Sequence, residues 1–68
     1  MKKEILNVNG MSCSHCEKAI QDAVSNLTGV KQVVANAKEK TVIVSYNEDV
    51  IGLNLIKEAI EEEGYVVV

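Results

Sequence analysis

The sequence contains no proline and no tryptophan, and cysteine occurs only twice in its 68 residues. A disulfide between the two, Cys13 and Cys16, would close a very short loop and stabilise the chain little, so we do not expect a structural disulfide. Basic residues are in the minority, with 7 Lys and Arg against 10 Asp and Glu, for a formal net charge of −3. This balance leaves no basic surface for a phosphate backbone, and we expect no nucleic-acid partner.

Long apolar runs are absent as well. No stretch approaches the roughly 20 apolar residues that span a bilayer. The first ten residues, MKKEILNVNG, hold no apolar segment long enough for a secretory signal. The sequence therefore predicts a cytoplasmic protein without direct membrane insertion. In a reducing cytoplasm, a lone cysteine pair is more often catalytic or metal-binding than structural.

Aliphatic residues are plentiful, since 47% of the chain is hydrophobic. The length predicts one domain, residues 1–68. Apolar periodicity predicts strands at 4–8, 30–35, 41–46 and 65–68, a helix at 15–26, and a second helix that opens near the candidate caps Asn47 and Asp49 and ends at Gly64. Two successive strand-helix-strand units predict an α+β fold: a ferredoxin-like βαββαβ sandwich, with a four-stranded antiparallel sheet and both helices on one face.

The same periodicity predicts which side chains are buried. In the first strand, Leu6 and Val8 share one face, with Ile5 on the other. The apolar face of the first helix is predicted to hold Cys16, Ala19, Ile20, Ala23, Val24 and Leu27, and that of the second Leu55, Ile56, Ala59 and Ile60. Gly29 is expected to close the first helix.

The stretch NGMSCSHCEKAI carries both cysteines, with His15 between them. Ser14 and Glu17 match a capping box, with Ser14 as N-cap and Glu17 three residues on. This assignment puts Cys13 in the loop and Cys16 in the first helical turn. There, unpaired N–H groups and the helix dipole favour a thiolate.

Three chemistries compete for this pair. A thioredoxin-like dithiol oxidoreductase also uses Cys-x-x-Cys at a helix start, but the chain is too short for that fold and lacks proline and tryptophan. A structural zinc site needs four ligands, and only Cys13, Cys16 and His15 are available nearby. An exposed site with two thiolates suits a soft monovalent ion, and Cu(I) fits best.

The residues also carry a family resemblance. The motif GMSCSHC after a first strand, the "GV" that opens the second strand and the "EEEGY" before the last strand together resemble the heavy-metal-associated domain, and within it the small bacterial copper chaperones. The resemblance covers essentially all 68 residues. It implies that Cys13 and Cys16 bind Cu(I) and that the chain is not an enzyme.

The resemblance also implies roles around the metal. Met11 is expected to pack beneath the loop, and Tyr65 to lie near the loop and limit solvent access. Similar zinc-specific members usually carry an aspartate where this chain has Ser12, which argues against zinc. His15 has two readings that we keep: a functional one, in which it tunes the thiolates or meets a partner, and one in which it is simply a solvated residue. Ser14 is counted among the residues around the site for its capping role.

The expected function is a copper chaperone that delivers Cu(I) by thiolate exchange to the metal-binding domain of a copper-transporting P-type ATPase. A copper-responsive repressor is a further candidate recipient, and an exposed low-coordinate site invites a Cu(I)-bridged homodimer. The alternatives are an excised N-terminal metal-binding domain of a copper ATPase, a dithiol oxidoreductase, and a zinc-binding member of the same fold.

Overall fold

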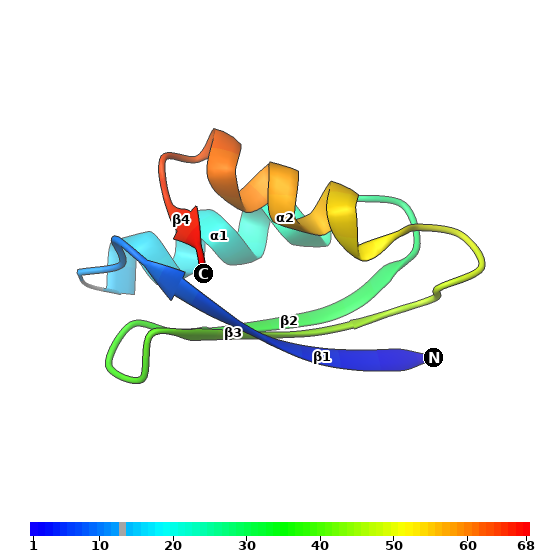
Figure 1. The fold of residues 1–68 in the computed structure, drawn as a ribbon, viewed down its shortest axis with the longest axis horizontal. Helices are drawn as coiled ribbons and strands as arrows, with labels where there is room; N and C mark the ends of the chain where they lie inside the picture. Colours follow the sequence, from blue (N-terminus) through cyan, green and yellow to red (C-terminus); the bar gives the residue numbers. More distant parts are fainter. Residues whose placement is uncertain (13) are drawn as a thin grey trace.

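The computed structural model describes residues 1–12 and 14–68 of the chain. Its elements follow one another in the predicted order (Figure 1): β1 (Lys2–Asn9), α1 (Ser14–Ser25), β2 (Val30–Asn36), β3 (Thr41–Tyr46), α2 (Leu53–Glu62) and β4 (Val66–Val67). The β3 bounds agree with the prediction, and β1, α1 and β2 differ from it by one or two residues at their ends.

The sheet has the strand order β2-β3-β1-β4, and every neighbouring pair is antiparallel. β1 pairs with β3 over most of its length, from Lys2↔Tyr46 to Asn7↔Thr41, and only its last two residues pair with β4. Both helices lie on the same face of this sheet (Figure 1). The predicted ferredoxin-like sandwich is therefore confirmed.

The core lies between the helices and the sheet. Leu6 and Val8 are buried while Ile5 is 62% exposed, as the alternation along β1 predicted. The helices contribute four fully buried side chains, and β3 adds three buried ones: Ile20, Val24, Ile56, Ile60, Val42, Val44 and Tyr46. No polar or charged side chain is buried among residues 1–12 and 14–68. Aliphatic burial on one face of the sheet is thus the main source of stability.

The predicted caps of α2, Asn47 and Asp49, are wrong. The helix begins at Leu53, and its N-cap is Gly52, which makes no side-chain capping bond. Asn47 instead accepts a hydrogen bond on Oδ1 from the Asp49 N–H at 3.0 Å, in a separate turn that follows β3. An asparagine side chain that bonds the backbone two residues on favours a turn over helix initiation, which explains the late start of α2.

Two further predictions need correction. Leu55 is 54% exposed and does not share the buried face of α2. Gly29 does not close α1, which ends at Ser25; it lies directly before β2 with φ +98°. Gly64 does follow the end of α2, with φ +97° and an N–H that bonds the Glu61 carbonyl at 2.9 Å.

Candidate metal site

The loop between β1 and α1 carries the cysteine motif. Cys13, one of the two predicted ligands, lies outside the described residues. Cys16 is the third residue of α1, within the first helical turn, where the N–H groups have no intrahelical acceptor. Its side chain is half-buried and packs against the core cluster.

Ser12, in the loop, and Cys16, four residues later in α1, lie side by side. The Ser12 Oγ is 3.8 Å from the Cys16 Sγ, and either atom can be the donor. The contact lies at the protein surface. The thiol of Cys16 therefore faces back over the helix start toward the loop, with a hydroxyl beside it.

Met11 and Tyr65 lie beneath and beside the loop. The Met11 side chain is only 7% exposed and belongs to the core, where it anchors the loop from below. A Cβ built on Gly10 would lie 3.3 Å from the Tyr65 Cδ1 and 3.8 Å from the Tyr65 Cα. The tyrosine ring thus packs against the first residue of the loop, and the pairing of Asn9 with Val66 places it there.

The start of α1 differs from the predicted capping box. The helix already includes Ser14, so this residue is not the N-cap in front of it. The Glu17 Oε2 accepts a hydrogen bond at 2.6 Å from the N–H of Ala37, which lies in the turn between β2 and β3. The carboxylate therefore does not reach back to the helix start. His15 and Ser14 are both exposed on the first turn.

The contact between Glu17 and the β2–β3 turn was not predicted from the sequence. The capping-box pattern of Ser14 and Glu17 predicted that the Glu17 carboxylate caps its own helix. In the structure it accepts a hydrogen bond from Ala37, which lies 20 positions further along the chain. No signal within either segment indicates that pairing. Among residues 1–12 and 14–68, no cluster of three or more His, Cys, Asp or Glu side chains could hold a metal ion.

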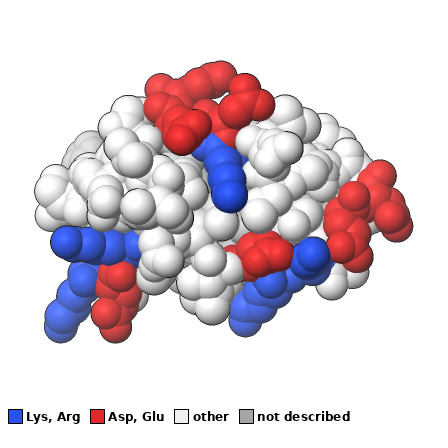
Figure 2. All heavy atoms as spheres, in the orientation of Figure 1, with Lys and Arg blue, Asp and Glu red and all other residues white. Residues whose placement is uncertain are grey.

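Charge is unevenly distributed over the surface. Figure 2 shows acidic side chains gathered above α2, where Glu58, Glu61 and Glu62 are exposed. Such a run of exposed carboxylates is typical of the solvated face of a helix.

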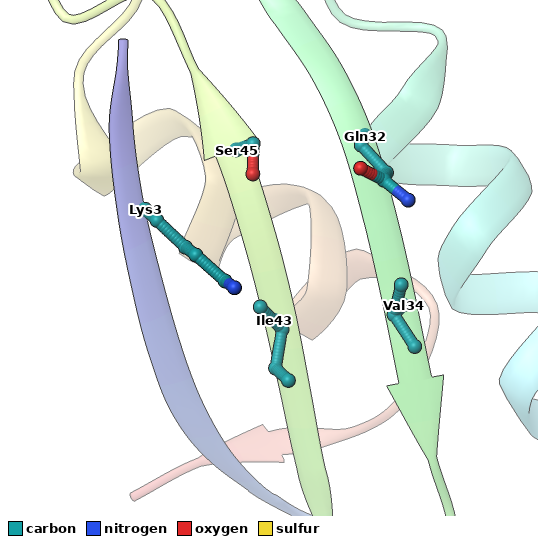
Figure 3. Close-up of a pocket in the computed structure, with 5 residues that line it drawn as sticks. All are labelled: Lys3, Gln32, Val34, Ile43 and Ser45. Atoms are coloured by element: carbon teal, nitrogen blue, oxygen red, sulfur yellow. The ribbon is translucent and has the colours of Figure 1, made fainter.

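A shallow hollow of about 130 Å³ lies on the sheet, lined by Lys3, Gln32, Val34, Ile43 and Ser45 (Figure 3). Ile43 and Ser45 alternate along β3 with the buried Val42 and Val44, so the hollow is on the face that the helices leave open. The described residues of the loop between β1 and α1 contribute none of its lining residues. None of the helices in the described part of the chain is long and apolar enough to cross a membrane.

A ferredoxin-like sandwich with a Cys-x-x-Cys sequence where β1 leads into α1 defines the class of small thiol-bearing metal-binding domains. The heavy-metal-associated domain model matches residues 5–66, and the chain belongs to that family.

The relatives agree with this membership. The chain is 43% identical to the copper chaperone CopZ of Staphylococcus aureus, over 100% of both chains. A solved CopZ metallochaperone is 42% identical, with a TM-score of 0.97 over 98% of this chain and all of that one. The N-terminal domain of a potential copper-translocating P-type ATPase from Bacillus subtilis, solved in the Cu(I)-loaded state, is 29% identical, with a TM-score of 0.90 over 96% of this chain and 81% of that one. The similarity supports copper binding, in either a chaperone or an ATPase domain.

Proposed function

We propose that this chain is a cytoplasmic copper chaperone, a single domain of residues 1–68 that binds one Cu(I) between the thiolates of Cys13 and Cys16. It releases the ion to the metal-binding domain of a copper-transporting P-type ATPase, and it carries out no catalysis. The observation that carries the proposal is the 43% identity to a copper chaperone over the whole length of both chains.

The chemistry of the cysteine pair supports Cu(I) as the cargo. Thiolates are soft ligands and select a soft monovalent ion. Two thiolates and one Cu(I) leave one net negative charge. The first turn of α1, which carries Cys16, offers unpaired N–H groups and the positive end of the helix dipole to that charge.

Ser12 supports copper over zinc. Its Oγ lies 3.8 Å from the Cys16 Sγ, so the position beside the thiol holds a neutral hydroxyl. A carboxylate there would give Zn²⁺ a hard anionic ligand, which a hydroxyl does not replace. The neighbouring His15 is exposed and offers an imidazole outside the pair, as a group that meets the partner.

We propose that copper leaves by stepwise thiolate exchange. An incoming thiolate of the partner bonds Cu(I) first, which gives a three-coordinate intermediate, and then one Cu–S bond to this chain breaks. A second thiolate of the partner replaces the remaining Cu–S bond in the same way, so that both cysteines of this chain are released. The exposed Ser12, Ser14 and His15 around Cys16 leave room for that approach. A copper-responsive repressor would receive copper by the same exchange, and a second copy of this chain would give a Cu(I)-bridged dimer.

A second candidate function is that of a metal-binding domain within a copper ATPase. The likeness to the Bacillus subtilis ATPase domain favours it, because that domain has the same fold and was solved in the Cu(I)-loaded state. Cu(I) binding is common to both functions. Transfer separates them, since a chaperone passes copper to a separately purified ATPase domain and remains in solution as the apo form.

The test is an anaerobic competition titration of the reduced protein against chromophoric chelators, with Cu(I) and separately with Zn²⁺. We expect one Cu(I) per chain, much weaker Zn²⁺ binding, and loss of tight Cu(I) binding in both Cys13→Ser and Cys16→Ser. Ser14→Ala is the control, because it changes an exposed neighbour and leaves both thiols. Preferred Zn²⁺ binding, or tight Cu(I) binding by a single-cysteine variant, would contradict the proposal.

A further inference from the structure

The turn between β2 and β3, residues 37–40, is a compact and well-defined structure. The Asn36 Oδ1 accepts a hydrogen bond from the Glu39 N–H at 3.1 Å, and Lys40 adopts a left-handed conformation with φ +58°. In Figure 1 this turn lies at the same end of the molecule as the loop between β1 and α1. A side chain that bonds the turn backbone and a left-handed closing residue are both typical of tight hairpin connections.

The turn is hydrogen-bonded to residues on both sides of the loop between β1 and α1. On one side, the Val8 N–H donates to the Lys40 carbonyl at 2.9 Å, two residues before Gly10. On the other side, the Ala37 N–H donates to the Glu17 carboxylate at 2.6 Å, one residue after Cys16. The two elements that flank the cysteine segment, β1 and α1, are therefore hydrogen-bonded to the same turn.

The tie to α1 is a side-chain bond and can be removed without changing the backbone. Glu17 is half-buried, and a carboxylate that accepts from a backbone N–H makes a charge-assisted hydrogen bond, shorter and stronger than a neutral one. One helical turn further on, the Gln21 Oε1 accepts from the Ala35 N–H at 3.1 Å. The Gln21 bond attaches α1 to the edge strand β2, and the Glu17 bond attaches the first helical turn of α1, which carries Cys16, to the β2–β3 turn.

We propose that Glu17 is a positioning residue for the metal site. Its bond to Ala37 holds the first turn of α1 against the β2–β3 turn, and this keeps the Cys16 thiolate in place to retain bound copper. The inference rests on the proposed Cu(I) function. First helical turns fray readily because their N–H groups have no helical partner, so removing this bond lets the thiolate move away from the ion.

The experiment compares Glu17→Ala and Glu17→Gln with Glu58→Ala, which removes the same charge from an exposed site on α2. Amide hydrogen exchange of Ala37 in the apo protein reports the bond itself. The rate at which Cu(I) passes to excess chelator reports retention. Thermal unfolding followed by circular dichroism confirms that each variant is folded.

In Glu17→Ala we expect faster exchange of the Ala37 amide and about tenfold faster loss of Cu(I), the lower end of the effect of groups that orient metal ligands. Glu17→Gln should recover part of both, because its amide oxygen can accept the same bond. Glu58→Ala should stay within about twofold of the parent protein.

Three results would overturn the inference. The first is an unchanged exchange rate of the Ala37 amide in Glu17→Ala. The second is an unchanged rate of Cu(I) loss in that variant although the amide exchanges faster. The third is an equally fast loss of Cu(I) in Glu58→Ala, which would mean that net charge alone acts. Failure of the unaltered protein to bind Cu(I) would instead refute the proposed function, and this arm is measured first.

Discussion

Gly29, at the entry to β2, is the position where the fold should be least tolerant of a side chain. Its φ is +98°, and a Cβ there would lie 2.9 Å from both the Ile51 Cγ2 and the Val50 Cγ1, and 3.0 Å from the Val50 Cβ. Rotation of Val50 cannot relieve the last contact, because its Cβ is fixed by the backbone. Ile51 is only 6% exposed and has little space in which to move.

Two costs therefore add in Gly29→Ala. A left-handed conformation costs a residue with a Cβ about 1–2 kcal/mol, and overpacking costs about 1–3 kcal/mol. The sum, about 2–5 kcal/mol, is large beside the roughly 3–10 kcal/mol that a chain of this length is expected to have in total. We expect a population of unfolded protein that is visible without denaturant.

Gly64→Ala is the matched control. Gly64 has φ +97°, but a Cβ there meets nothing within 4 Å, so only the conformational cost of about 1–2 kcal/mol applies. Urea unfolding of the reduced apo protein, followed by far-ultraviolet circular dichroism, measures both variants. The difference between them isolates the overlap with Ile51 and Val50. Equal losses in the two variants would refute the reasoning, because the overlap would then cost nothing.

Two further predictions concern the buried face of α2 and the ring of Tyr65. Ile56→Ala should lower the free energy of unfolding by about 2–5 kcal/mol, because Ile56 is fully buried. Leu55→Ala, one residue earlier and largely exposed, should change it by about 0.5 kcal/mol or less; comparable values in urea titrations would contradict the placement of α2. On the proposal that the Tyr65 ring beside Gly10 shields the loop, Tyr65→Leu should speed Cu(I) loss to a chelator by about tenfold; unchanged loss would leave Tyr65 a packing residue only.

Much of the fold followed from local periodicity. Val42 and Val44 alternate with more exposed residues along β3, and Ile20 and Val24 recur at helical spacing, so their burial was predictable from the sequence. The position of Cys16 in the first turn of a helix was predictable for the same reason, because the helical pattern starts beside it. The family motif then indicated copper and the ligand pair, and the assignment of Cys13 and Cys16 as ligands stays a prediction.

Other features depend on contacts between segments that are distant in sequence. The sequence around Glu17 predicted a local capping role. Its carboxylate instead accepts from the Ala37 N–H, because the fold places the β2–β3 turn beside α1. Leu55 fits the helical pattern, but whether a position on an amphipathic helix is covered depends on which neighbour packs there. Asn47 had two local options, a cap or a turn, and the route from β3 to α2 selected the turn.

The sequence by itself determined the order of strands and helices, the ferredoxin-like sandwich, and the place of Cys16 in the first turn of a helix, because apolar periodicity acts over a few neighbouring residues. Only the tertiary structure decided what surrounds Cys16 and the loop before it. The Tyr65 ring against Gly10 and the β2–β3 turn hydrogen-bonded to residues on both sides of the loop arise when the sheet brings together residues far apart in the chain. Such contacts leave no periodic trace in either of the segments that make them.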